Sequence, residues 1–105
     1  MKKKKFPNFK DDLLQRLKDP ERAEGYLNAA LQDEDKRVFL LALRDVAEAQ
    51  GGMTKLSRLT NISREHIYRM LSEKGNPELT TLKALLNAIG LKLAIEIKKQ
   101  PPKAA

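Results

Sequence analysis

The sequence predicts an all-α fold in one small domain, with a short β-strand at its C-terminal end. Apolar residues recur at helical spacing through most of residues 8–90, and cap and stop signals divide this stretch into short helices. After Gly90 the apolar period changes from that of a helix to the alternation of a strand. A chain of 105 residues is long enough for one modest core and too short for two.

The composition excludes several classes of function. The chain is 33% charged and 41% hydrophobic, and it has no apolar run long enough to span a membrane. Its basic start, MKKKKFPNF, is not followed by the apolar core of a signal peptide, so we expect a cytoplasmic protein. With no cysteine and one histidine, it cannot build a cysteine metal site, a histidine cluster or a Ser-His-Asp arrangement within one chain. We therefore predict no enzyme, no metal and no cofactor.

The N-terminal third is predicted to hold a basic arm and two helices. Residues 1–7 form the arm, which is expected to be flexible, and residues 8–33 form a helical extension. Asn8, with Asp11 three residues later, is a plausible cap for a helix through about Lys18. Asp19-Pro20 repeats the start signal for a helix through Leu31, with a core-facing stripe of Ala23, Tyr26, Leu27, Ala30 and Leu31.

Residues 34–90 are predicted to form the main helical core. Asp33 or Asp35 caps a helix that stops at Gly51-Gly52. Because the stretch from Val38 to Leu43 is apolar all round, we expect this helix to be the central buried one, contributing Phe39, Leu43, Val46 and Ala47 to the core. A last helix, capped by Thr80 or Thr81, carries Leu82, Leu85, Leu86 and Ile89 and stops at Gly90.

Residues 52–72, GMTKLSRLTNISREHIYRMLS, have the pattern of a helix-turn-helix. Leu56, Leu59 and Ile62 supply one apolar stripe, and Ile67, Met70 and Leu71 supply a second. Thr54 and Ser63 are candidate N-caps. Asn61 stands at the turn, and Asn tolerates a left-handed backbone better than other non-glycine residues do.

The outward face of the second helix suits DNA. With the second stripe facing inward, Glu65, Arg69 and Ser72 point outward, and Arg64 and Tyr68 lie on one flank. Arg can grip guanine, Glu can accept from cytosine, and Tyr can contact a phosphate or a thymine methyl group. Ser63 offers its hydroxyl to backbone phosphates. The alternative is an ordinary solvated face with a Glu65–Arg69 pair, and the two-helix seam favours the DNA interpretation.

Residues 91–99 alternate as a strand does, with Leu91, Leu93, Ile95 and Ile97 between more polar residues. A lone strand is unstable, so it must pair with its symmetry mate or with another protein, or pack as an irregular extension. A final helix is the weaker alternative. Residues 100–105 are expected to be a disordered tail.

The net charge of +7 is unevenly distributed. Residues 1–10 carry five lysines, residues 11–50 are net −4, and residues 51–75 and 76–105 are each net +3. The basic segments include the predicted helix-turn-helix, as binding to the DNA backbone requires. The acidic segment must serve another partner.

These motifs together resemble a known family. The run from Tyr26 to Leu93 contains YLNAAL, FLLALRDVA, the recognition-helix residues SRE, IY and ML, and the ending GNP, TL, LL, A and GL. In this order and spacing it is similar to addiction-module antidote proteins, the HigA-like antitoxins with a lambda-repressor-like (Xre-type) helix-turn-helix. The chain departs from the usual family pattern at Ser57 and Asn61, where a small Ala and a turn Gly are common.

The resemblance implies a five-helix DNA-binding core that forms a homodimer on a palindromic operator and represses its own operon. It also implies a partner, typically a RelE/ParE-like toxin that cleaves mRNA. By position, the family's DNA-facing places fall on Thr54, Lys55, Ser63, Arg64, Glu65, Tyr68 and Arg69. Two alternatives stay open: a stand-alone prophage-type regulator without a toxin, and a toxin inhibitor with weak DNA binding.

The acidic segment adds one expectation that the resemblance does not supply. A ribonuclease toxin binds a polyanion and should be basic, so an acidic surface is a candidate docking face. The candidate residues on this surface are Glu21, Glu24, Asp33 and Glu34.

Overall fold

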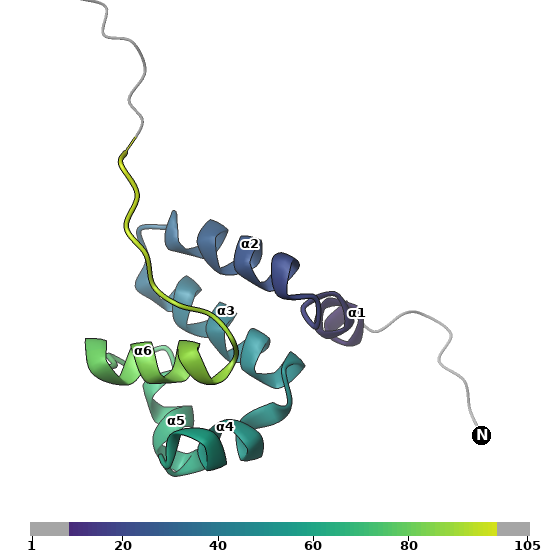
Figure 1. The fold of residues 1–105 in the computed structure, drawn as a ribbon, viewed down its shortest axis with the longest axis vertical. Helices are drawn as coiled ribbons and strands as arrows, with labels where there is room; N and C mark the ends of the chain where they lie inside the picture. Colours follow the sequence, from purple (N-terminus) through teal and green to yellow (C-terminus); the bar gives the residue numbers. More distant parts are fainter. Residues whose placement is uncertain (1–8, 99–105) are drawn as a thin grey trace, which may run out of the picture.

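The computed structural model describes residues 9–98, and within this range it contains six helices and no strand. In chain order they are α1 (Phe9–Arg16), α2 (Pro20–Leu31), α3 (Lys36–Ala49), α4 (Gly52–Thr60), α5 (Arg64–Met70) and α6 (Leu79–Ala88). Figure 1 shows α2 lying along α3, with α4, α5 and α6 grouped at the other side of α3. The predicted arm at residues 1–7, the cap at Asn8 and the tail at residues 100–105 lie outside the described residues.

The start signals of α2 and α3 are confirmed. The Asp19 carboxylate accepts a hydrogen bond from the Glu21 backbone N–H at 3.1 Å, and Pro20 is the first residue of α2. Asp35 caps α3 by accepting from the Arg37 N–H at 3.0 Å. Each cap satisfies an N–H that the helix cannot pair itself.

Two predicted helix ends are wrong. Helix α1 ends at Arg16 rather than near Lys18. Helix α6 begins at Leu79, so neither Thr80 nor Thr81 is its cap; Glu78 takes that position without a side-chain hydrogen bond. Glu78, Leu79 and Thr80 are all exposed, so water can satisfy the free N–H groups of this first turn.

Helix α3 forms the centre of the core, as predicted. Half of its 14 residues are buried: Phe39, Leu40, Ala42, Leu43, Val46, Ala47 and Ala49. It is not buried all round, since Val38 and Leu41 are 38% and 39% exposed. The helix therefore has one solvent-facing edge, although the sequence there is continuously apolar.

Helices α1 and α2 belong to this same core. Leu17, in the turn after α1, is buried with the α3 residues, as are Ala23, Leu27 and Ala30 of α2. Helix α1 itself contributes Leu13 and Leu14, which are partly buried against this core. Leu31, predicted to face the core, is 52% exposed at the end of α2. The Gln50 side-chain amide donates to the carbonyl oxygens of Leu17 (2.8 Å) and Lys18 (3.2 Å). This contact ties the α1–α2 turn to the end of α3.

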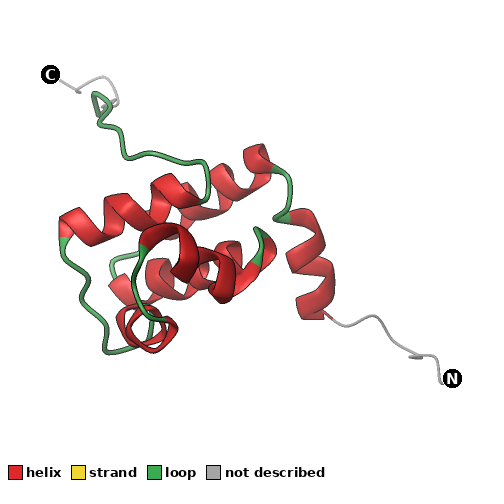
Figure 2. Ribbon diagram, turned by 60° about the horizontal axis from the view of Figure 1, so that its bottom comes forward, coloured by secondary structure: helices red, strands yellow, loops and turns green. Residues whose placement is uncertain are grey.

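The predicted C-terminal strand is not formed in residues 91–98. Gly90, with φ 84°, ends α6, and the Leu91 N–H donates to the Leu86 carbonyl at 2.8 Å. Leu91 packs against the core, after which the segment runs out beyond the helices as an extended chain (Figures 1 and 2). A strand needs a neighbour to receive its backbone hydrogen bonds, and one copy of this chain supplies none to residues 91–98. None of the described helices is long and apolar enough to cross a membrane.

Candidate nucleic-acid interface

The α4–α5 pair is joined by a tight turn of three residues. Helix α4 ends at Asn61, whose φ of 62° and ψ of 29° are left-handed, and its N–H donates to the Ser57 carbonyl at 2.8 Å. Asn61 is the one non-glycine residue with positive φ in residues 9–98, which confirms the predicted turn. Ile62 and Ser63 then lead directly into α5, so the helices cross instead of forming a rod.

Ser57 braces this turn from inside. Its hydroxyl donates to the Ile62 carbonyl oxygen at 2.5 Å, joining the last turn of α4 to the residue that precedes the α5 cap. An alanine cannot make this bond. The hydroxyl therefore stabilises the crossing at one of the two positions where the sequence departs from the usual family pattern.

The two predicted caps have different outcomes. Ser63 caps α5, because its hydroxyl oxygen accepts from the His66 N–H at 3.1 Å. Thr54 does not cap α4: that helix begins at Gly52, two residues earlier, after Gly51 with φ 121° and ψ −8°. A pair of glycines lets the chain reverse between α3 and α4 without a side-chain cap. Thr54 instead lies exposed in the first turn of α4.

The seam between the helices is mostly as predicted. Leu56, Ile67, Met70 and Leu71 are buried, and Ile62 is partly buried against them. Leu59 is not part of the seam, since it is 53% exposed. Its place on the inner side of α4 is taken by Met53, which is buried three residues before Leu56.

Above this seam, the outer side chains of both helices are exposed. Thr54 and Lys55 on α4, and Arg64, Glu65 and Arg69 on α5, are all open to solvent. Ser57, Ser63, Arg64, Glu65 and Tyr68 line a shallow depression where the two helices meet. The structure thus brings Ser57 of α4 together with Ser63 and with Arg64, Glu65 and Tyr68 of α5, whereas Thr54, Lys55 and Arg69 do not line this depression.

Tyr68 contacts Arg44 of α3. The Arg44 guanidinium lies over its ring, 5.0 Å from the ring centroid, and Tyr68 is half-buried. A cation–π contact of this kind fixes the ring plane. It also places one more positive charge beside the depression.

Arg69 is exposed, as the helical spacing predicts, whereas Ser72 is not fully outward. Arg69 Nη2 lies 3.1 Å from His66 Nδ1, and no ion pair joins Arg69 to Glu65 among the described residues. Glu65 is therefore available to accept from another molecule. Ser72 lies beyond the end of α5, partly buried, with its hydroxyl donating to the Arg69 carbonyl at 2.8 Å.

The four acidic residues predicted to meet a partner are exposed but lie at two ends of α2. Glu21 and Glu24 are near its start, whereas Asp33 and Glu34 follow its end. Twelve helical residues span roughly 18 Å, so one small patch does not include all four. Glu21 and Glu24 border a groove that continues past Leu27, Leu31 and Phe39 to residues 91–96.

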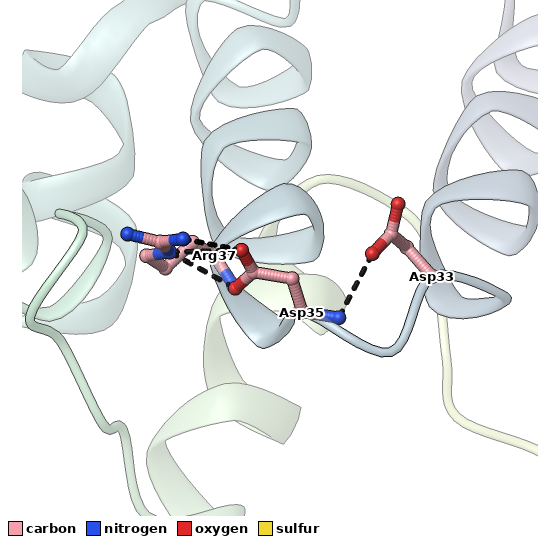
Figure 3. A network of polar contacts seen from close by, with 3 residues as sticks. All are labelled: Asp33, Asp35 and Arg37. Carbon is pink, nitrogen blue, oxygen red and sulfur yellow. Dashed lines mark hydrogen bonds and ion pairs between the residues drawn. The ribbon is translucent and has the colours of Figure 1, made fainter.

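The turn after α2 carries a polar network (Figure 3). Asp33 accepts from the Asp35 N–H at 2.8 Å, and Asp35 accepts from the Arg37 Nε and Nη2, at 3.0 and 2.6 Å. The hydrogen bonds from the Arg37 side chain, and then the one from its backbone N–H, lower the pKa of Asp35 to about 2, and the bonded Asp35 carboxylate raises the pKa of Arg37. Asp33 is thus part of the loop's own structure, which leaves Glu34 more open to a partner.

The comparison with family models decides the relationship of the chain. The model described as "Probable addiction module antidote protein" matches residues 8–97, which include every described helix and both candidate surfaces. The chain belongs to this family of antidote proteins. An antidote implies a toxin as its partner.

One curated relative of this antidote protein is an uncharacterized protein of Haemophilus influenzae. It is 34% identical over 85 residues, covering 81% of this chain and 87% of the relative. No solved structure matches the chain. Within residues 9–98 no group of three or more metal-ligating side chains comes together.

Sequence reasoning missed two features of this antidote protein. The groove beside α2 depends on where residues 91–96 lie, which no periodicity reveals. The hydrogen bond from the Tyr26 hydroxyl to Asp45, at 2.9 Å, joins α2 to α3. Burial first, and then Asp45, raise the pKa of Tyr26 to about 12. Tyr26 is thus a core aromatic, as predicted, with a polar partner that its sequence neighbours do not indicate.

Proposed function

We propose that this protein is the DNA-binding antitoxin of a type II addiction module, a HigA-like antidote with a lambda-repressor-like (Xre-type) helix-turn-helix. In this proposal it neutralises a RelE/ParE-like toxin and represses its own operon as a homodimer on a palindromic operator. Half-sites would then lie about 34 Å apart or at a multiple of that distance. The role requires no catalytic step and no cofactor.

The observation that carries the DNA-binding proposal is the outer face of α5. Arg64, Glu65 and Arg69 are exposed, while Ile67 on the opposite face is fully buried against α4. A helix held in this way can enter a major groove without disturbing its packing, and the first-turn N–H groups that Ser63 does not cap would then be free to donate to backbone phosphates.

Each residue then has a chemical role. Arg64 and Arg69 would read guanine, and Glu65 would accept from cytosine. Tyr68 would contact a phosphate or a thymine methyl group, with its ring oriented by Arg44. The residues that would position the protein on the backbone are Thr54, Lys55 and Ser63; the predicted Ser72 is left out, because its hydroxyl donates to the Arg69 carbonyl.

The charge distribution supports this assignment. The α4–α5 region, residues 51–75, is net +3, and the segment that includes α1 to α3, residues 11–50, is net −4. The DNA backbone is negative and repels this acidic segment. In a complex, α1 and α2 would therefore face away from the DNA. Two surfaces of opposite charge suit two partners, DNA and a basic toxin.

For the toxin, we propose the acidic surface on α2 and the turn that follows it. Glu21 and Glu24 are both exposed near the start of α2, where their carboxylates can pair with basic residues of a toxin. Reversing Glu21 and Glu24 to Lys should weaken toxin binding at low salt more than reversing Asp33 and Glu34, because Asp33 is engaged in its own turn. Equal affinities for all variants would remove this surface from the proposal.

The experiment that tests the function is binding to the DNA immediately upstream of the gene, compared with random duplex across a salt series. Preference for the upstream DNA by roughly a thousandfold or more would support operator recognition. Weak binding without preference, with a steep salt dependence, would favour a toxin inhibitor. Specific binding without any toxin gene nearby would favour a stand-alone regulator.

A further inference from the structure

Residues 91–98 form an extended segment that lacks a partner. Leu91 packs on the core, but Leu93 is 40%, Ile95 99% and Ile97 92% exposed. Between these apolar residues stand Lys92, Ala94, Glu96 and Lys98, and neither Lys92 nor Glu96 forms an ion pair within residues 9–98. Two neighbouring isoleucines almost fully in water, on a chain with strand alternation, indicate a surface that is covered in the assembled protein.

We propose that a second copy of this chain covers it, through antiparallel pairing of residues 91–97 about a two-fold axis at Ala94. In this register Lys92 lies opposite Glu96 of the second copy, and the symmetry makes this pair twice. Leu91 lies opposite Ile97, and Leu93 opposite Ile95, so apolar residues meet apolar residues. The smallest side chain of the segment, Ala94, meets its own copy on the axis.

Other symmetric registers are less favourable, which is why the segment specifies this one. Centring the pair on Ile95 places Lys92 opposite Lys98, and centring it on Glu96 places Glu96 opposite itself. Like charges directly opposite one another destabilise a strand pair. Centring it on Leu93 leaves Lys92 opposite Ala94, with no charge pairing, and shortens the ribbon. Axes between residues place apolar side chains opposite polar ones.

The groove beside α2 supplies what a two-stranded ribbon needs to be stable. A ribbon on its own is marginal in water and must pack its apolar face on something. Leu91 and Leu93 border the groove together with Leu27 and Leu31 of α2, and Lys92, Ala94 and Glu96 line it as well. Ile97 and Ile95 of the second copy would lie beside Leu91 and Leu93 at this groove, where Leu31 is half exposed in one copy, so pairing would remove apolar surface from water.

A charge swap tests the register. Sedimentation across a concentration series should show a dimer for the natural protein. Lys92→Glu and Glu96→Lys should each raise the dimer Kd by roughly 2- to 30-fold, because each change breaks two symmetry-related pairs. The double variant Lys92→Glu/Glu96→Lys should restore the natural Kd. Lys98→Glu is the matched control: it lies opposite Gly90 in this register and should leave the Kd unchanged.

A single cysteine tests the axis directly, because the chain has none of its own. Cα atoms of residues directly opposite in an antiparallel pair are about 4.5–5.5 Å apart, within the range of a disulfide. Ala94→Cys should therefore form a cross-linked dimer under oxidised glutathione, which accepts the two electrons of thiol oxidation. Lys98→Cys should not, since its own copy lies eight residues away along the ribbon, roughly 26 Å.

Some outcomes would overturn the proposal. A monomer at every concentration would do so, as would a dimer whose Kd ignores both single charge changes. Single variants that are not rescued by the swap would rule out direct pairing. A stronger dimer in Lys98→Glu would assign the register centred on Ile95 instead. If the protein associates only after purified toxin is added, the segment pairs with the toxin and not with a second copy.

This inference deepens the proposed function, because it names the interface of the proposed homodimer. Every assay uses the protein without DNA or toxin, so the dimer and operator recognition are tested separately. Circular dichroism should show unchanged helix content in all variants, since the changed side chains are exposed. If this dimer forms but shows no preference for operator DNA, the proposed interface stands and the proposed repressor role is wrong. Operator binding by a monomer would keep DNA recognition and remove the homodimer together with this interface.

Discussion

The Ser57 hydroxyl donates to the Ile62 carbonyl oxygen at 2.5 Å and so joins α4 to the turn that places α5. We expect Ser57→Ala to destabilise the protein by about 1–3 kcal/mol, because a partly buried carbonyl loses its donor. Urea unfolding measures this directly. Thr60→Val is the control: the Thr60 hydroxyl donates within its own helix, to the Leu56 carbonyl at 2.8 Å, and its loss should cost much less. Equal losses would show that the Ser57 bond does not brace the turn.

The outer faces of α4 and α5 should contribute differently to DNA binding. Arg69→Ala should weaken operator binding by roughly 1–3 kcal/mol and relax specificity at one base pair, whereas Lys55→Ala should weaken all duplexes alike and reduce the salt dependence. Arg22→Ala, on α2, should have little effect. Fluorescence anisotropy on operator and random DNA distinguishes these results. If Arg69→Ala lowers affinity equally for both duplexes, its assignment to a base edge is wrong.

Gly75 occupies a place where no side chain fits. A Cβ there would come within 1.9 Å of the Met70 carbonyl oxygen, which is backbone and cannot move aside without disturbing the end of α5. Gly75→Ala should therefore lower the free energy of unfolding by about 1–3 kcal/mol or more. Gly25→Ala is the opposite case: in α2 a Cβ meets nothing within 4 Å, and the change should stabilise by roughly 0.5–1 kcal/mol. Thermal unfolding of the pair tests both signs.

Asp35 should make stability depend on acid pH. Its folded pKa is about 2, below the usual value near 3.9, so its contribution is fully present above pH 4 and is lost as the pH falls toward 2. In Arg37→Met we expect the pKa of Asp35 to rise toward its usual value and the loss of stability between pH 4 and 2 to become smaller. NMR titration of the carboxyl carbon measures the first effect, and melting temperatures measure the second.

Arg22→Met is the control for this titration. It removes an exposed arginine whose Nε lies 3.7 Å from Asp19 Oδ2, while the hydrogen bonds between Asp35 and Arg37 stay intact. An Asp35 carboxyl that titrates normally in the natural protein would contradict the geometry of the loop.

Local chemistry explains which predictions succeeded. Asp19-Pro20, Asp35 and Ser63 were recognisable as helix starts because a cap acts within three residues of itself. Asn61 was recognisable as the turn because few residues tolerate its backbone angles. The predicted caps at Thr54 and Thr80 are wrong because each residue lies inside the first turn of a helix that begins earlier. A hydroxyl near a helix start caps the helix only if the chain enters the helix at that residue.

The sequence by itself determined the helical class, the order of most elements, the inward residues of α3 and α5, and the family, because periodicity and capping are local properties of the chain. Only the tertiary structure decided that α1 and α2 share the core of α3, that Glu21 and Asp33 lie at opposite ends of α2, and that residues 91–98 find no partner within one copy. Those facts depend on contacts between residues far apart in the chain. A strand pattern states what a segment can pair with, and the presence of a neighbour decides whether the strand forms.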